Sequence, residues 1–193
     1  MTEFFWIRHG PTHARGMVGW TDIDADLSDR AALARLAALL PAGAPVISSD
    51  LRRAVATADA LQGQRPRLPH DPALREMHFG AWEGITHDEA AAHDPALARA
   101  LWETPGDIAP PGGESWNALA ARVSAATEAL ADRHRGGAVV IVAHFGPILS
   151  QIGRAAGIAA PALFSRPVAP LSLTRLRRVS PGRWAETGGA TPG

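Results

Sequence analysis

The stretch Phe4-Phe5-Trp6-Ile7, followed at once by Arg8-His9-Gly10, decides the fold class of this 193-residue chain. A short apolar run that ends abruptly in polar residues is typical of a strand buried on both faces of a sheet. Ala138-Val139-Val140-Ile141-Val142-Ala143 is a second such run and ends at His144, while Pro45-Val46-Ile47-Ser48 is a shorter third. These segments predict three buried strands, each with polar residues at its carboxyl end.

Amphipathic helical patterns separate the strand candidates. Leu33, Leu36, Ala37 and Leu40 recur at helical spacing after an expected N-cap at Ser28. A longer pattern follows Gly113-Glu114-Ser115 and consists of Trp116, Leu119, Val123, Thr127 and Leu130. This alternation predicts the α/β class, as a three-layer α/β/α sandwich with a mostly parallel central sheet.

One domain is expected to cover residues 1–187, because a chain of this length suits a single core. Between residues 86 and 113 the pattern weakens into short helical pieces and a Pro/Gly stretch, which predicts a small helical insertion, or lid, over the active-site edge of the sheet. Residues 171–176 alternate as a half-buried strand should. Residues 188–193 are expected to be a flexible tail.

Composition narrows the classes of partner. The 19 basic and 19 acidic residues balance, which argues against nucleic acid or an anionic membrane as a partner. The chain has no cysteine, which excludes disulfides, thiolate zinc sites and cysteine nucleophiles. Glu3 stands where a signal peptide has positive charge, and no stretch approaches the ~20 apolar residues of a membrane span. We therefore expect a cytoplasmic protein; its oligomeric state is not readable, and a homodimer stays open.

Polar residues from distant parts of the chain should meet at one edge of the sheet. The carboxyl ends of parallel strands share an edge, and ligands bind in the crevice outside it. Arg8, His9, the segment Ser48–Arg53 and His144 would all lie there. Two guanidiniums and two imidazoles in one crevice suit a phosphate group.

Each residue type has a use in phosphoryl chemistry. Arginine presents a planar fork of N–H donors to phosphoryl oxygens. A neutral imidazole can attack phosphorus, and a second one can donate to the oxygens. The leaving alkoxide needs a proton, which a carboxylic acid near the mouth could supply before activating water. Glu76, within Leu74–Gly84, is the best candidate for that acid.

The sequence resembles the histidine phosphatase superfamily, also called phosphoglycerate mutase-like, over nearly the whole chain. Four segments carry the resemblance, in the family's order: Arg8-His9-Gly10-Pro11-Thr12, Ser48–Ala58, Leu74–Gly84, and Val142-Ala143-His144-Phe145-Gly146. Gly19-Trp20-Thr21-Asp22 looks like the segment leading to the first helix. Arg-His-Gly by itself would be a weak signal, but the four motifs together are a strong one.

The resemblance implies a role for each matching residue. It makes His9 the phosphorylated nucleophile, places Arg8, Arg53 and His144 around the phosphate, and gives proton donation to Glu76, with Glu83 supporting it. The substrate-binding candidates are Thr12, Arg15, Trp20, Phe145 and Gly146. No metal and no cofactor are implied. Arg15 departs from the family's frequent Asn, and Phe145 from its usual small residue, so the mouth of this pocket is expected to differ.

Other residues have plainer interpretations. Arg52 is expected to be a surface ion-pair partner. His13, His70, His78, His87, His93 and His134 match no pattern and are expected on the surface. Trp82, Trp102 and Trp116 could line a pocket or pack in the core. A metal cluster of His9, His144, His13 and Glu76 is disfavoured, because two arginines beside it would repel a cation.

These expectations combine into a metal-independent phosphomonoester hydrolase that acts on a small phosphorylated metabolite through a phosphohistidine. The size and Gly112-Gly113-Glu114-Ser115 are similar to α-ribazole phosphate phosphatases, although broad-specificity members share these features. Two alternatives stay open: a phosphoglycerate mutase and a phospho-ligand binding module without turnover. Family members with mutase activity resemble a longer chain with additional insertions near the mouth, so the short chain argues for hydrolysis. The presence of both His9 and Glu76 argues against the binding module.

Overall fold

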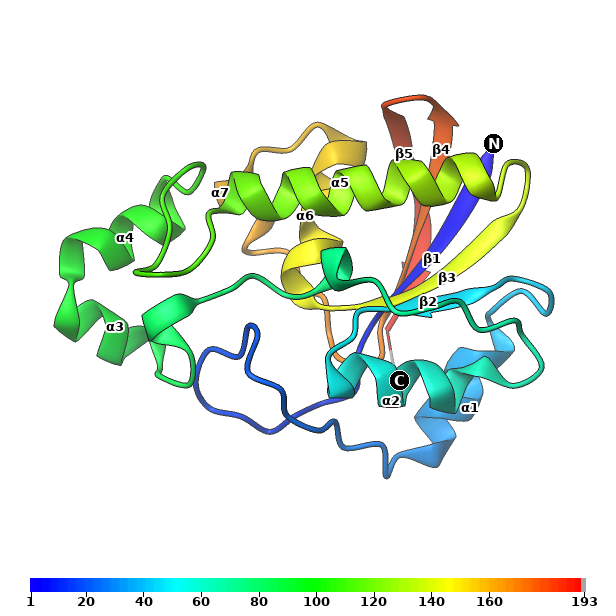
Figure 1. The fold of residues 1–193 in the computed structure, drawn as a ribbon, viewed down its shortest axis with the longest axis horizontal. Coiled ribbons are helices and arrows are strands. Elements are labelled where there is room, and N and C mark those ends of the chain that lie inside the picture. Colours follow the sequence, from blue (N-terminus) through cyan, green and yellow to red (C-terminus); the bar gives the residue numbers. More distant parts are fainter. Residues whose placement is uncertain (192–193) are drawn as a thin grey trace.

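A computed structural model describes residues 1–191 and contains one five-stranded sheet with the order β2-β3-β1-β4-β5 (Figure 1). The strands are β1 Thr2–Arg8, β2 Val46–Ser48, β3 Ala138–Ala143, β4 Leu173–Ser180 and β5 Arg183–Ala190. The helices are α1 Arg30–Ala38, α2 Arg52–Gln62, α3 His87–His93, α4 Pro95–Glu103, α5 Trp116–Arg133, α6 Phe145–Ala156 and α7 Ala160–Leu163. Two 3₁₀ turns cover Pro72–Leu74 and Gly80–Trp82.

The sheet is parallel in its core and antiparallel at one side. β1 and β2 each pair in parallel with β3, whereas β4 opposes both β1 and β5. Four of the five strands therefore run in one direction, and the predicted α/β class with a mostly parallel sheet is confirmed. The three predicted apolar runs became β1, β2 and β3, the three strands that lie side by side.

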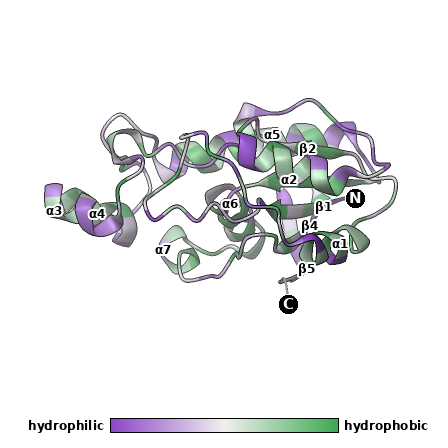
Figure 2. Ribbon diagram, turned by 90° about the horizontal axis from the view of Figure 1, so that it is seen from below, coloured by the Kyte–Doolittle hydropathy of each residue, from purple (hydrophilic) through white to green (hydrophobic). Residues whose placement is uncertain are grey.

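Helices cover both faces of the sheet and make the three layers predicted from the sequence. Phe4 and Trp6 of β1 belong to the core cluster shared with α5 and α6, whereas Phe5 and Ile7 point to the other face, against α1 and α2. Figure 1 shows the sheet between α5 on one side and α1 and α2 on the other, and Figure 2 shows the molecule from the side of α1 and α2. Because side chains alternate along a strand, a continuous apolar run such as residues 4–7 fills two cores at once.

The helix starts follow ordinary capping chemistry, with one correction. The N-cap of α1 is Asp29, whose carboxylate accepts from the Ala32 N–H at 2.8 Å, and not Ser28 as predicted. The Ser28 N–H donates instead to the carboxylate of Asp26, in the loop that precedes the helix. The N-cap of α5 is Ser115, as its position before the apolar pattern suggested.

The weakly patterned region between residues 86 and 113 contains α3 and α4, which project beyond the sheet (Figure 1, left). Thr86 and Glu89 form a reciprocal capping box at the start of α3, and Asp94 caps α4 ahead of Pro95. These caps satisfy the first N–H groups of the two short helices, which bury Ala90, Ala98 and Leu101 in the larger core cluster. The predicted helical insertion is therefore present.

The C-terminal end differs from its prediction in two ways. β4 begins at Leu173, because Leu171 has a left-handed backbone with φ of 59°. Gly188, Gly189 and Ala190 belong to β5 and pair with β4, so the expectation of a flexible tail from residue 188 is wrong for these residues; residues 192–193 of that tail lie outside the described residues. Within residues 1–191, no helix has the length and apolarity needed to cross a membrane.

Candidate active site

The ends of β1 and β3 bring two histidines together. Arg8, the last residue of β1, pairs in parallel with Ala143, the last residue of β3. His9 directly follows β1, and His144 directly follows β3. The His9 N–H donates to the Ala143 carbonyl at 3.0 Å, and the two imidazole rings lie 5.0 Å apart between centroids. Both side chains are buried, with exposed fractions of 7% and 0%. Two chain segments 135 residues apart thus meet as the strand-end argument expected.

The hydrogen bonds of His9 determine which ring nitrogen is free. Nδ1 lies 2.7 Å from the Gly10 carbonyl, which can only accept, so Nδ1 carries the proton. Burial, followed by the charge of Arg53, lowers the pKa of His9 to about 3. The imidazole is therefore neutral near pH 7, with the lone pair on Nε2.

Arg53, in the first turn of α2, stands beside that lone pair. Its Nε–H donates to His9 Nε2 at 3.3 Å, while its two terminal nitrogens donate to the carbonyls of Thr21 at 2.9 Å and Gly19 at 2.6 Å. Arg53 is 1% exposed, whereas Arg52 points outward and pairs with Asp22 and Asp24. Arg52 is thus the surface ion-pair partner predicted from the sequence, whereas phosphate binding by Arg53 stays a prediction.

Arg8 and His144 each present a polar atom without a protein partner. Arg8 donates to the Val168 carbonyl at 2.6 Å, but its buried Nε has no hydrogen-bond partner among the described residues. His144 Nε2 contacts Ser49 Oγ at 2.7 Å, and its buried Nδ1 is likewise unpartnered there. Burial and then His9 hold the pKa of His144 well below 6.5. Buried orphan atoms are rare and costly, so they indicate a place for a polar ligand.

Glu76 is buried and lies close enough to Arg53 and Arg8 to feel their charges. Oε1 accepts from the N–H groups of Met77 at 2.9 Å and Gly146 at 3.0 Å. Burial raises the pKa of Glu76, and these two N–H groups with Arg53 and Arg8 oppose the rise only in part. The carboxyl group therefore holds its proton to a higher pH than an exposed glutamate does, as an acid catalyst requires.

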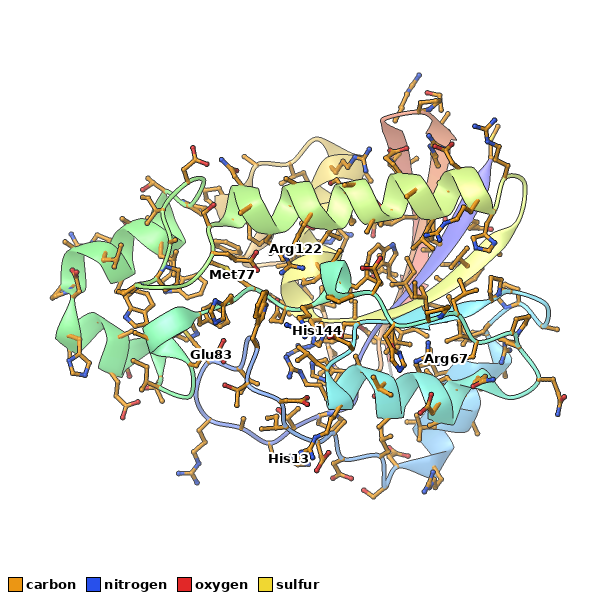
Figure 3. The ribbon with its side chains drawn as sticks, in the orientation of Figure 1. His13, Arg67, Met77, Glu83, Arg122 and His144 are labelled. Carbon is orange, nitrogen blue, oxygen red and sulfur yellow. The ribbon has the colours of Figure 1, made fainter. Side chains whose placement is uncertain are left out.

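Arg122 and Glu114 hold the backbone that carries Glu76, and sequence reasoning did not find either of them. Arg122 on α5 donates to the carbonyls of Ala73, Arg75 and Glu76 at 2.8–2.9 Å and pairs with Glu114 at 2.5 Å (Figure 3). Glu114 Oε1 in turn accepts the His78 N–H at 3.0 Å. The ion pair thus fixes the segment on both sides of the carboxylate. Glu114 lies in the Gly112–Ser115 stretch, which served only as a clue to substrate, and Arg122 lies in none of the four family motifs, so nothing in the sequence signalled their pairing.

Glu83 performs a similar task for the loop after β1. Its carboxylate accepts the N–H groups of Gly19, Trp20 and Thr21 at 2.8–3.1 Å. The carbonyls of Gly19 and Thr21 are the groups that hold Arg53. Glu83 therefore acts on the site through the loop, in line with its predicted supporting position.

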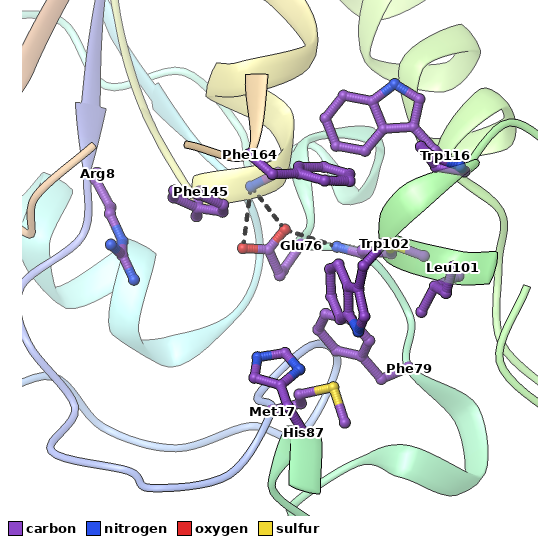
Figure 4. Close-up of a pocket in the computed structure, with 13 residues that line it drawn as sticks. Arg8, Met17, Glu76, Phe79, His87, Leu101, Trp102, Trp116, Phe145 and Phe164 are labelled. Carbon is purple, nitrogen blue, oxygen red and sulfur yellow. Dashed lines mark hydrogen bonds between the residues drawn. The ribbon is translucent and has the colours of Figure 1, made fainter. Parts of the chain in front are cut away.

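A cavity of about 540 Å³ opens next to Glu76 and Arg8. Figure 4 shows Arg8 and Phe145 on one side of the Glu76 carboxyl group and the rings of Trp102, Trp116 and Phe164 on the other. Of the tryptophans weighed from the sequence, Trp102 and Trp116 line this cavity, whereas Trp82 belongs to the core. Phe145 and Gly146 also line it, and their contact with substrate stays a prediction. His87 is exposed, as predicted, and also reaches the mouth of this cavity.

The remaining binding candidates lie outside the cavity lining. Thr12 is half-buried and Arg15 is exposed on the loop after β1. Trp20 lies on the Arg75 guanidinium at 4.8 Å, and its Nε1–H donates to the Glu76 carbonyl at 2.9 Å. Trp20 therefore supports the backbone at Glu76. Contacts of Trp20, Thr12 and Arg15 with substrate stay predictions.

Comparisons with known proteins agree with this geometry. A bifunctional protein of Mycobacterium tuberculosis is 35% identical over 161 residues, which cover 76% of this chain and 42% of that protein. A metal-independent phosphoserine phosphatase of Arabidopsis thaliana is 33% identical over 156 residues, or 76% of this chain and 65% of that protein. The chain thus spans less than two thirds of the length of these relatives.

Solved structures extend the likeness to the whole chain. The structure of Bacillus stearothermophilus YhfR superposes with a TM-score of 0.85 at 32% identity, covering 96% of this chain and 95% of that one. The sequence model of the histidine phosphatase superfamily (branch 1) matches residues 4–188, a range that contains every residue of the site described above. The chain therefore belongs to the histidine phosphatase superfamily, branch 1.

Proposed function

We propose that this chain is a metal-independent phosphomonoester hydrolase that acts through a phosphohistidine on a small phosphorylated molecule. The observation that carries the proposal is the state of His9. Its Nδ1–H is held by the Gly10 carbonyl, its pKa is depressed, and its free Nε2 lies beside the Arg53 guanidinium. A neutral nucleophile beside fixed positive charge is what attack on a phosphate dianion requires.

The first step forms a phosphorus–nitrogen bond. His9 Nε2 attacks phosphorus in line while the bond to the leaving alcohol oxygen breaks, and Glu76 gives its proton to that oxygen. Arg8, Arg53 and His144 bind the other phosphoryl oxygens, and the orphan Arg8 Nε and His144 Nδ1 supply unused polar contacts for them.

The second step restores the enzyme. Water attacks the phosphorus atom, the Glu76 carboxylate takes a proton from that water, and the phosphorus–nitrogen bond breaks to release inorganic phosphate and neutral His9. Two guanidiniums provide the positive charge that a divalent ion supplies in other phosphatases. The metal-independence named for the Arabidopsis relative supports this part of the proposal.

The test removes the nucleophile. A His9→Asn variant is expected to lose about a thousandfold or more in kcat with p-nitrophenyl phosphate, whereas the matched variant of an exposed histidine, His93→Asn, keeps the parent's rate. Acid quenching of the parent with ³²P-labelled substrate should trap acid-labile label on His9. Parent-like turnover by His9→Asn would refute the assignment.

Two further readouts separate the alternatives. Release of free phosphate from a simple monoester without a bisphosphate primer is expected for a hydrolase and not for a mutase. Activity is also expected to persist in excess EDTA; a complete loss that a divalent ion restores would reinstate a metal mechanism.

A further inference from the structure

The cavity beside Glu76 is lined almost entirely by apolar and aromatic groups, although it adjoins a site built for an anion. Five aromatic side chains line it: Phe79, Trp102, Trp116, Phe145 and Phe164. All except Trp116 are only partly buried, so their rings keep surface open to the cavity. Exposed aromatic surface gathered in one concave place indicates a binding site for an apolar group.

The rings come from separate elements and brace one another. Trp102 on α4 and Trp116 at the start of α5 both pack edge to face against Phe164, with centroids 5.7 Å and 5.1 Å apart. His87 on α3 packs edge-on against Trp102 at 4.8 Å. The helical insertion thus supplies one wall, and edge-to-face contacts fix the rings before any ligand arrives.

Charge in the cavity is confined to the end where chemistry would occur. Apart from His87, the ionisable lining residues are Arg8 and Glu76, and both belong to the proposed phosphoryl chemistry. Partial burial lowers the pKa of His87, which favours its neutral ring. A substrate carboxylate placed among the rings of Trp102, Trp116 and Phe164 would lose its hydration without gaining an ionic partner there.

The position of Glu76 relates this cavity to the reaction. Glu76 lies between the Arg8 guanidinium, which is 5.4 Å from the Phe145 ring, and the rings of Trp102, Trp116 and Phe164 (Figure 4). An acid that protonates the leaving oxygen stands where the phosphoryl group ends and the alcohol part begins. The alcohol part must therefore extend from Glu76 into the aromatic cavity.

We infer that the preferred substrates are phosphomonoesters of an uncharged alcohol that carries an aromatic ring. This inference rests on the proposed function, because it places the phosphoryl group against His9. The cavity volume of about 540 Å³ accommodates a ring system with a short linker. Phosphorylated amino acids and sugar acids, whose alcohol parts are charged, should be poor substrates.

The test compares esters whose leaving alcohols are similar in basicity. The parent protein is expected to hydrolyse 2-phenylethyl phosphate with a kcat/KM about 10- to 100-fold above that of ethyl phosphate, from burial of one phenyl ring. O-phospho-L-serine should fall below ethyl phosphate. Trp102→Ala and Phe164→Ala should each lower the phenylethyl-to-ethyl ratio about 10-fold, whereas Val179→Ala, on the far strand β4, should leave it unchanged.

Taking the ratio within one preparation cancels any loss of folded protein, so a destabilised variant still gives a decisive result. A parent ratio near one, or a preference for phosphoserine, would overturn the inference and leave the phosphatase proposal standing. A high ratio that survives both aromatic substitutions would also overturn it. If no ester released phosphate, the proposed function and the inference would fail together.

Discussion

Replacing Glu76 with glutamine removes the titratable proton and keeps the other contacts of this side chain. The amide oxygen of the new side chain can still accept the N–H groups of Met77 and Gly146, which bind the native Oε1 at 2.9 Å and 3.0 Å. The side chain keeps nearly the same volume, and the buried titratable group disappears. Glu76→Gln should therefore fold normally while losing the proton that the leaving oxygen needs.

The size of the loss should depend on the substrate. General acid catalysis contributes about 10²- to 10⁴-fold, or about 3–5 kcal/mol of barrier, and ethyl phosphate, whose alkoxide is a strong base, should show the whole of it. p-Nitrophenolate leaves without a proton, so phosphorylation of His9 should remain fast with p-nitrophenyl phosphate. Water attack still lacks its base, so one equivalent of p-nitrophenol should appear in a burst before slow turnover.

The pH profile provides a second readout of the same change. Because burial raises the pKa of Glu76, the parent's kcat with ethyl phosphate should fall as pH rises through that raised pKa and the acid form is lost. Glu76→Gln should lack this descending limb.

Rapid-mixing measurements on the parent, Glu76→Gln and the exposed control Glu103→Gln test the reasoning. The control should match the parent in rate and in pH profile. Two results would refute the assignment of the acid: ethyl phosphate turnover by Glu76→Gln within about threefold of the parent, or equal losses on both esters without a burst.

Two other predictions follow from the surroundings of the site. Arg122→Met should lower kcat for ethyl phosphate about 10-fold while retaining the p-nitrophenol burst, because Arg122 positions the segment of the acid; Arg122→Lys should recover part of the rate, and equal losses on both esters would contradict this role. The pKa of His9 is lowered from 6.5 in the unfolded chain to about 3 in the folded protein, so acidification protonates the unfolded chain first and destabilises the fold. Between pH 7 and pH 5 the free energy of unfolding of the parent, measured in urea, should fall by about 2 kcal/mol more than that of His9→Asn. Equal falls would show that His9 has an ordinary pKa.

The sequence predicted the meeting of His9, Arg53 and His144 because the geometry of parallel strands leaves little freedom. Once residues 4–7 and 138–143 are buried parallel strands, their carboxyl ends share one edge, and the residue after each strand must lie there. The hydrogen bonds of Arg122 to the segment that carries Glu76 could not be predicted from strand geometry. They depend on how α5 is rotated against a chain segment 46 residues away, which tertiary packing decides.

The wrong prediction of a flexible tail from residue 188 has a local cause. Glycines at 188 and 189 suggested freedom, yet a Cβ at position 189 would lie 2.4 Å from the Leu173 carbonyl oxygen. Glycine here permits close approach of β5 to β4, and the backbone hydrogen bonds of a strand pair need no side chain. Glycine in a sequence is therefore consistent with tight packing as well as with flexibility.

Burial also influences the net charge of the site. The pKa values of His9 and His144 are lowered and that of Glu76 is raised, so burial shifts each of the three towards its uncharged form; with all three uncharged, the charge of the site is that of its arginines. Arg8 and Arg53 remain cations, because arginine keeps its proton in proteins. The site then presents two positive charges to a phosphomonoester dianion that carries two negative ones. A site in which Glu76 were ionised and a histidine protonated would carry the same net charge, but it would have neither a free nucleophile nor a proton to give.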